Sequence, residues 1–98
     1  MSRSQSLNLM LRLFLYMKFY TYILYSSALD SFYIGYTSME IDERIKKHNT
    51  NQKGFTGRTK DWMCVYFEEY ETKKEAYARE REIKAKKSRK YIENLIVG

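Results

Sequence analysis

The chain has 98 residues, with 18 Lys and Arg against 12 Asp and Glu, one cysteine and no proline. This length allows one domain with a modest hydrophobic core and is too short for two. The single cysteine, Cys64, excludes a disulfide framework and a cysteine-rich zinc site. We expect a buried thiol, which suits a reducing compartment, and therefore a cytoplasmic protein.

Residues 1–16 differ in character from the rest of the chain. A Ser-rich start leads into an apolar run over residues 7–16, which is too short to span a bilayer and is interrupted by Arg12. Cleavage of a signal peptide near Ala28 would remove the first predicted strand, so we reject that interpretation. We expect a domain over residues 17–98, preceded by an extension that is frayed or packed as an extra amphipathic turn.

Two strands are predicted at the start of this domain, over residues 19–25 and 32–37, because both segments are rich in Tyr, Ile and Phe and a polar loop separates them. Alternate residues of a strand share a face. If the strands pair as a hairpin, Tyr22 and Tyr33 therefore face the same pocket. Gly35 inside the second strand indicates a close backbone approach or a bulge.

A helix is predicted next, running to about residue 49. Thr37 precedes Glu40 by three residues, the spacing of a capping box at a helix start. Arg44 and His48 lie four residues apart along one edge of the apolar stripe of this helix. We therefore expect both side chains to face the rest of the fold and not the solvent.

The remaining segments complete the fold. Residues 50–61 read as a loop with two glycines beside cations, which suits contact with a backbone phosphate or is simply a turn. A third strand over residues 62–70 is followed by a helix that Thr72 caps, to about residue 87, and a last helix over residues 89–96 that Ser88 caps. The order β-β-α-β-α-α predicts an α/β layered (α+β) fold, a small three-stranded antiparallel sheet flanked by helices.

Two features of the second half suggest function. Glu80 lies on the apolar stripe of its helix, where a carboxylate is costly unless it is paired, and a salt bridge to Arg79, Lys84 or Arg44 would account for it. Residues 84–90 contain five cations and no acid. Such a run attracts polyanions, nucleic acid above all, but a solvated helix end explains it equally well.

The pattern as a whole resembles a known family. The chain contains two triplets, Tyr20-Thr21-Tyr22 and Tyr33-Ile34-Gly35, in which Tyr22 and Tyr33 are eleven positions apart. Arg44 and His48 follow on the predicted helix. This arrangement resembles the GIY-YIG nuclease superfamily, in particular its small stand-alone single-domain members. The resemblance extends from about residue 17 to the C-terminus. The chain departs from the family pattern where Tyr20-Thr21 stands in place of Gly-Ile.

The resemblance implies a role for each of these residues. Tyr22 or Tyr33 would help to activate the attacking water, His48 would take or relay its proton, and Arg44 would bind the scissile phosphate. Glu80 would hold the metal, Mg²⁺ or Mn²⁺, because such ions need only one or two carboxylates together with water and phosphate. The residues expected to contact nucleic acid are Gly35, Lys53, Arg58, Lys60, Lys84, Lys87 and Arg89.

We therefore expect a metal-dependent endonuclease that hydrolyses phosphodiester bonds of DNA, with RNA as a further possibility. Branched, nicked or damaged DNA, in repair or recombination, is the expected substrate, and no membrane association is expected. Two alternatives stay open. One is a non-catalytic nucleic-acid-binding module, and the other is a nuclease subunit that is active only with a protein partner that supplies target recognition.

Overall fold

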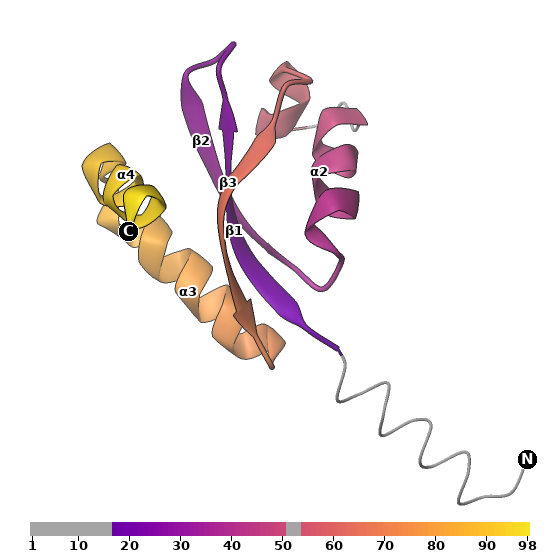
Figure 1. Cartoon of the computed structure of the whole chain (residues 1–98), viewed down its shortest axis with the longest axis vertical. Coiled ribbons are helices and arrows are strands. Elements are labelled where there is room, and N and C mark those ends of the chain that lie inside the picture. The colour runs from indigo at the N-terminus through magenta and orange to yellow at the C-terminus, as the bar shows by residue number, and fades with distance from the viewer. Residues whose placement is uncertain (1–16, 51–53) are drawn as a thin grey trace, which may run out of the picture.

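The computed structural model describes residues 17–50 and 54–98 and has the element order expected from the sequence. Its strands are β1 (Phe19–Ser26), β2 (Ser31–Thr37) and β3 (Met63–Tyr70). Its helices are α2 (Ile41–Thr50), α3 (Lys73–Lys86) and α4 (Arg89–Val97), and a 3₁₀ turn, η1 (Phe55–Arg58), precedes β3. The predicted three-stranded antiparallel sheet is confirmed, with α2 on one face and α3 and α4 on the other (Figure 1).

The central strand of the sheet is β1, which pairs antiparallel with β2 on one side and β3 on the other. Tyr22 pairs with Gly35 and Leu24 pairs with Tyr33, so the predicted hairpin is confirmed and both tyrosines lie on the same face. The register between β1 and β3 shifts after Ile23, as at a β-bulge. Both β2 and β3 are therefore edge strands.

The core is divided between the two faces of the sheet. The cluster on the α2 face is built on Tyr22, Leu24 and Trp62. On the opposite face, Thr21 is buried and its hydroxyl donates to the carbonyl of Ala76 in α3 at 2.7 Å. Since successive residues of β1 point to opposite faces, each helix layer takes every second side chain of this strand.

Two of the predicted helix starts are confirmed. The hydroxyl oxygen of Thr72 accepts the backbone N–H of Glu75 at 3.2 Å, and that of Ser88 accepts the backbone N–H of Tyr91 at 3.1 Å. Each cap satisfies an N–H group that has no partner within its own helix. These caps fix the first residues of α3 and α4 at the positions expected from the sequence.

The predicted capping box at Thr37 is wrong. Thr37 is the last residue of β2, where it pairs with Tyr20, and its hydroxyl oxygen accepts the N–H of Met39 at 2.9 Å. A residue held in the sheet ladder cannot also begin a helix. The helix α2 starts later, at Ile41.

The segment between α2 and β3 is anchored by side chains and not by regular structure. The amide of Asn49 donates to the carbonyl of Trp62 at 3.0 Å and accepts its N–H at 2.9 Å. The indole N–H of Trp62 donates to the carbonyl of Thr56 at 2.9 Å, and Asp61 accepts the hydroxyl of Ser26 at 2.5 Å. These bonds hold η1, predicted only as a loop, against α2 and the β1–β2 hairpin.

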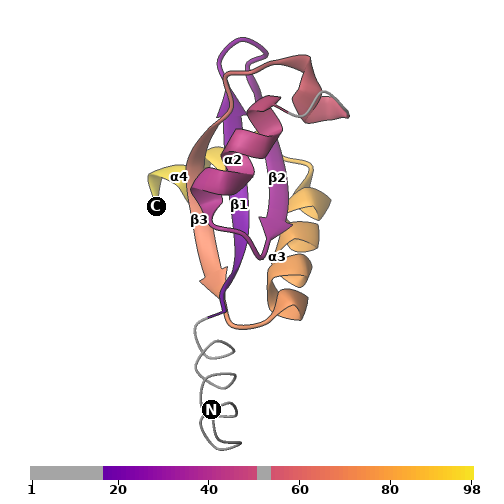
Figure 2. The same ribbon diagram turned by 90° about the vertical axis from the view of Figure 1, so that its right-hand side faces the viewer.

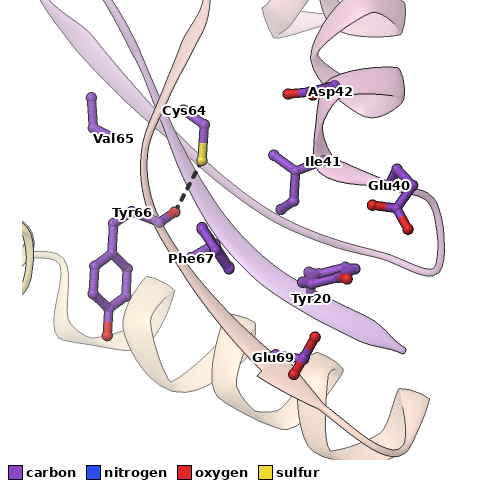
Figure 3. A pocket seen from close by; sticks show the side chains of 9 residues that line it. All are labelled: Tyr20, Glu40, Ile41, Asp42, Cys64, Val65, Tyr66, Phe67 and Glu69. Atoms are coloured by element: carbon purple, nitrogen blue, oxygen red, sulfur yellow. Dashed lines mark hydrogen bonds between the residues drawn. The ribbon is translucent and has the colours of Figure 1, made fainter. Parts of the chain in front are cut away.

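Cys64 is half-buried, so the expectation of a buried thiol is met only in part. Its thiol donates to the carbonyl of Tyr66 at 3.4 Å, and partial burial raises its pKa. The helix α2 covers only part of its face of the sheet, and Cys64 lies at the border of the uncovered part (Figure 3).

The extension predicted for residues 1–16 and the predicted contact residue Lys53 lie outside the described residues. Within residues 17–50 and 54–98, no helix combines the length and the apolar character needed to cross a membrane.

Candidate active site

Three predicted site residues form a hydrogen-bonded group between β1 and α2. The hydroxyl oxygen of Tyr22 lies 2.7 Å from Nε2 of His48 and accepts a hydrogen bond from Nε of Arg44 at 3.2 Å. Tyr22 and His48 are only 1% and 6% exposed. Because α2 brings residues four apart onto the same side, Arg44 and His48 both reach the sheet, as predicted.

Burial sets the charges of this group. It is the larger of two effects that lower the pKa of His48 to about 4, the other being the charge of Arg44, so the imidazole is neutral at pH 7. Burial also raises the pKa of Tyr22 to about 12, although Arg44 acts in the opposite direction. At neutral pH the group therefore carries one positive charge, on Arg44, and Tyr22 keeps its proton.

Gly35 provides the space that Tyr22 occupies. A Cβ atom at Gly35 would lie 2.5 Å from the hydroxyl oxygen of Tyr22 and 3.1 Å from the ring of Tyr33. The first of these distances is shorter than any normal contact between non-bonded atoms. The close approach predicted from a glycine inside a strand is therefore confirmed, and the atoms that approach belong to a side chain of the same site.

A hollow of about 210 Å³ opens beside the buried group. Its lining residues are Tyr33, Arg44, Lys47, His48, Gly54, Phe55 and Thr56. The Tyr33 ring lies against the His48 imidazole, with 5.0 Å between their centroids. Tyr22 shares the sheet face of Tyr33 but does not line the hollow. Of these two tyrosines, Tyr33 therefore lines the hollow, while Tyr22 lies below it and is hydrogen-bonded to Arg44 and His48.

Glu80 lies on the other side of the sheet, in α3, which runs along the β2 edge (Figure 2). Its side chain is buried, and Oε1 is 2.8 Å from Nζ of Lys84, so the predicted ion pair forms with Lys84. The charge of Glu80 also contributes to the raised pKa of Tyr22, less than burial does. Glu80 and the hollow therefore lie on opposite faces of the sheet.

Glu80 is the acid of this site that could bind a cation. Among the residues that the structure describes, no group of three or more His, Cys, Asp and Glu side chains could hold a metal ion. The carboxylate of Glu80 nevertheless already holds a positive charge, the Lys84 ammonium. One carboxylate is enough for Mg²⁺ or Mn²⁺ when water and substrate phosphate complete the coordination, so the residues fit such an ion.

Comparison with known proteins agrees with this geometry. A family model described as the GIY-YIG catalytic domain matches residues 18–92. The chain belongs to the GIY-YIG family. No curated protein and no solved structure matches it. The protein is therefore a nuclease, an endonuclease that hydrolyses phosphodiester bonds of nucleic acid, and nucleases of this family generally depend on a divalent metal.

The residues predicted to contact nucleic acid in this nuclease lie in different surroundings. Arg58 lies over the ring of Phe55, with its guanidinium carbon 5.5 Å from the ring centroid. Arg89 forms an ion pair with Asp30 at 2.7 Å, and Lys60 and Lys87 are exposed.

Gly35, by contrast, is buried beneath Tyr22. The structure shows that Gly35 makes room for the side chain of Tyr22. Its contact with nucleic acid stays a prediction.

The nuclease hollow also includes residues that the sequence analysis did not single out, Lys47, Phe55 and Thr56. Lys47 directly precedes His48 in the last turn of α2, where cations are common for reasons unrelated to function. Phe55 is 41% exposed. The sequence could have singled out Phe55, because it is a large apolar residue within a polar loop that contains glycines.

A larger hollow of about 680 Å³ lies between the start of α2 and β3, on the side of the sheet away from β2 (Figure 3). Three acids line it, Glu40, Asp42 and Glu69, together with apolar side chains such as Ile41 and Phe67. No lining residue of this hollow is a cation. A nuclease binds an anion, so the smaller, cationic hollow and not this one is the candidate active site.

Proposed function

We propose that this GIY-YIG nuclease is a metal-dependent DNA endonuclease that selects branched, nicked or damaged DNA and acts in repair or recombination in the cytoplasm. The hollow at which Tyr33, Arg44 and His48 converge is the observation that carries the proposal. It combines cations with groups that can handle protons and has no acid among its lining residues. The single free thiol supports the cytoplasmic assignment, because exported proteins of this size are usually stabilised by disulfides.

Arg44 binds the scissile phosphate in this proposal. Its Nε is bonded to Tyr22, which leaves the two terminal nitrogens of the guanidinium for phosphate oxygens. Because Tyr22 holds the guanidinium in place, little reorganisation is needed when negative charge grows on the phosphate in the transition state. Such preorganised donors contribute strongly to catalysis.

The attacking water is oriented by Tyr33, the tyrosine that lines the hollow. The water oxygen forms a bond to phosphorus while the bond from phosphorus to the leaving oxygen breaks. His48, which is neutral at pH 7 and lies against Tyr33, takes or relays the proton that the water loses. Tyr22 is too deeply buried to meet the water and acts by positioning Arg44 and His48.

Glu80 is the residue that would hold the metal ion, with Lys84 moving from the carboxylate to a phosphate oxygen. When bound, the ion would neutralise charge on the phosphate and stabilise the leaving oxygen. The half-exposed side chain of Lys84 is long and mobile enough for this exchange.

Selection of DNA by structure and not by sequence fits the contacts available. The candidate contact residues Arg58, Lys84 and Lys87 are cations, which bind phosphates and carry little sequence information. A surface of this kind discriminates substrates by the path of their backbone and by how easily they deform.

The proposal is tested by cleavage of labelled duplex, single strand, flap, fork, four-way junction and structured RNA, with Mg²⁺ and with EDTA. We expect cleavage only with metal, branched or interrupted DNA ahead of intact duplex and RNA, and a loss of about a hundredfold or more in Glu80→Ala. Glu82→Ala is the matched control, because Glu82 is a glutamate of the same helix that pairs with Arg79 instead.

Equal cutting by wild type and Glu80→Ala would contradict the role of Glu80. If the wild type binds with a steep salt dependence and cuts nothing, a binding module or a partner-dependent subunit replaces the proposal.

A further inference from the structure

Phe55 is an exposed aromatic residue at the border of the catalytic hollow. It is 41% exposed, and its ring is nearly parallel to that of Tyr33, with an angle of 14° and 6.5 Å between centroids. The guanidinium of Arg58 lies over the same ring at 5.5 Å. A flat ring with a cation beside it, next to the proposed phosphate site, has the composition of a surface that binds nucleobases.

Phe55 also lines a second hollow, of about 320 Å³, which leads away from the catalytic one. The other residues around it are Asp30, Ser31, Phe32, Lys87, Ser88, Arg89 and Ile92. Here too a cation lies on an aromatic ring, since the guanidinium of Arg89 is 5.1 Å from the ring centroid of Phe32. Because Phe55 belongs to both hollows, they form one continuous surface.

This surface follows the β2 side of the molecule. Figure 2 shows η1 and the connection between α3 and α4 on that side, at the same end of the sheet as the β1–β2 turn. It carries the rings of Tyr33, Phe55 and Phe32, with Arg58 over the ring of Phe55 and Arg89 over the ring of Phe32. Asp30 also lines this surface and forms an ion pair with Arg89, so these two residues together carry no net charge. We call this group of three rings and two cations the aromatic track.

The geometry points to a further function of the aromatic track: it binds the unpaired nucleotides that adjoin the scissile phosphate, with Phe55 as the residue on which a base stacks. This inference rests on the proposed function and narrows it to substrates with a single-stranded segment at the cut. Bases within a duplex are covered by their neighbours above and below, so only unpaired bases can stack on a side chain. Flaps, forks and single strands satisfy this condition, whereas intact duplex does not.

The experiment measures binding of the full-length chain in EDTA, so that it needs no cleavage. A short single-stranded oligothymidylate is compared with a strand of equal length and charge made of abasic units. The wild type should prefer the strand with bases by roughly tenfold or more, because the abasic strand keeps the phosphates and loses the stacking. The variant Phe55→Leu should lose most of this preference while binding the abasic strand as before. The slope of affinity against salt should not change, since no charge is removed.

Two further variants make the result specific. Phe55→Trp keeps a flat ring and should keep the preference for bases. Phe67→Leu removes an aromatic residue that is 55% exposed but lines the acidic hollow, and it should behave as the wild type. The inference is overturned if the wild type has no preference for bases, if Phe55→Leu keeps it, or if Phe55→Leu binds both strands equally less well. If the protein cleaves DNA but does not prefer the strand with bases, this inference is wrong and the proposed activity stands. If it prefers that strand but does not cleave, the proposed activity is wrong and this inference stands.

Discussion

The two hollows beside α2 differ in volume and in charge, and the larger one does not have the charge that suits a phosphate. The hollow near β3 holds about 680 Å³ and is lined by three acids and no cation, while the hollow near β2 holds about 210 Å³ and is lined by Arg44 and Lys47 and no acid. Both are bordered by the same helix. Of the three acids, Asp42 lies in the first turn of α2, Glu40 directly precedes the helix and Glu69 belongs to β3, whereas Arg44 and Lys47 lie further along α2.

The difference teaches that one short helix can border two hollows of opposite charge when the neighbouring strand and loop supply part of that charge. We expect the three acids to repel a phosphodiester from the larger hollow, and Arg44 and Lys47 to attract it to the smaller one, which His48 and Tyr33 also line. The larger hollow is more apolar and would suit a partner without phosphate. Volume alone would favour the larger hollow, whereas charge favours the smaller one.

The strongest way to break the comparison is to remove the chemistry of the β2-side hollow. Arg44→Ala and Tyr33→Phe should each reduce turnover by about 10²–10⁴-fold, because the first removes the phosphate-binding cation and the second the hydroxyl that orients the water. Steady-state cleavage assays measure the effect. Glu69→Gln, in the acidic hollow, should stay within roughly twofold of the wild type because it touches no step of the proposed reaction.

Circular dichroism is the control for these variants. If Arg44→Ala or Tyr33→Phe is unfolded, the residue serves the core and not the reaction. A loss in Glu69→Gln as large as in Arg44→Ala would show that the two hollows are not functionally distinct.

A subtler change leaves every functional group of the site in place. Gly35→Ala adds one methyl group where only 2.5 Å separate it from the Tyr22 hydroxyl, so the tyrosine must move and its bonds to Arg44 and His48 must lengthen. We expect turnover to fall by about tenfold or more and the free energy of unfolding to drop by about 1–3 kcal/mol, as for other overpacked cores. Cleavage kinetics and denaturant unfolding measure the two effects. Wild-type turnover in Gly35→Ala would mean that the position of Tyr22 does not matter for catalysis.

The sequence predicted the elements that depend on local patterns. Alternating residues located the strands, and hydroxyl caps at Thr72 and Ser88 located two helices, because these signals act over a few neighbouring residues. The start of α2 was wrong because the sheet took Thr37, an effect of a partner strand seventeen residues earlier in the chain at Tyr20. Likewise η1 is held by a hydrogen bond from the Trp62 indole to the carbonyl of Thr56, which no local sequence pattern predicts.

For the candidate site, the sequence predicted which face each tyrosine occupies but not how deeply each is buried. Period-two alternation put Tyr22 and Tyr33 on one face, yet it could not tell that one would be buried under α2 and the other would reach a hollow. The position of Glu80 across the β2 edge, and the role of Phe55 between two hollows, depend on how three separate elements pack. Packing of this kind is a property of tertiary structure, and the sequence contains it only implicitly.

The dependence of stability on pH tests the buried state of His48 in the candidate active site. Burial lowers the pKa of His48 to about 4 from its usual 6.5, so the unfolded chain takes up a proton at this residue before the folded protein does. His48 therefore favours the folded state fully above about pH 6.5, and this contribution is lost as the pH falls through about 4. Urea unfolding across this range should show a loss of about 3 kcal/mol. The loss should be absent in His48→Gln, and an unchanged pH dependence in that variant would contradict the neutral, buried state of His48.

The smallest expected effect concerns Cys64, which reports on the acidic hollow. Partial burial raises the pKa of its thiol, and the charge of Asp42 adds to this shift. A negatively charged disulfide reagent should therefore react with Cys64 a few-fold more slowly than a neutral one, relative to the same pair of reagents on a free thiol, and high salt should reduce the difference. Asp42→Asn should speed the reaction of Cys64 with the charged reagent and leave its reaction with the neutral reagent nearly unchanged.

A saturating amount of nucleic acid, added in EDTA, should not protect Cys64 from these reagents, because the strand follows the β2 side of the molecule and the thiol lies at the β3 side. Strong protection of Cys64 would place the nucleic acid in the acidic hollow, against the charge that its phosphates meet there.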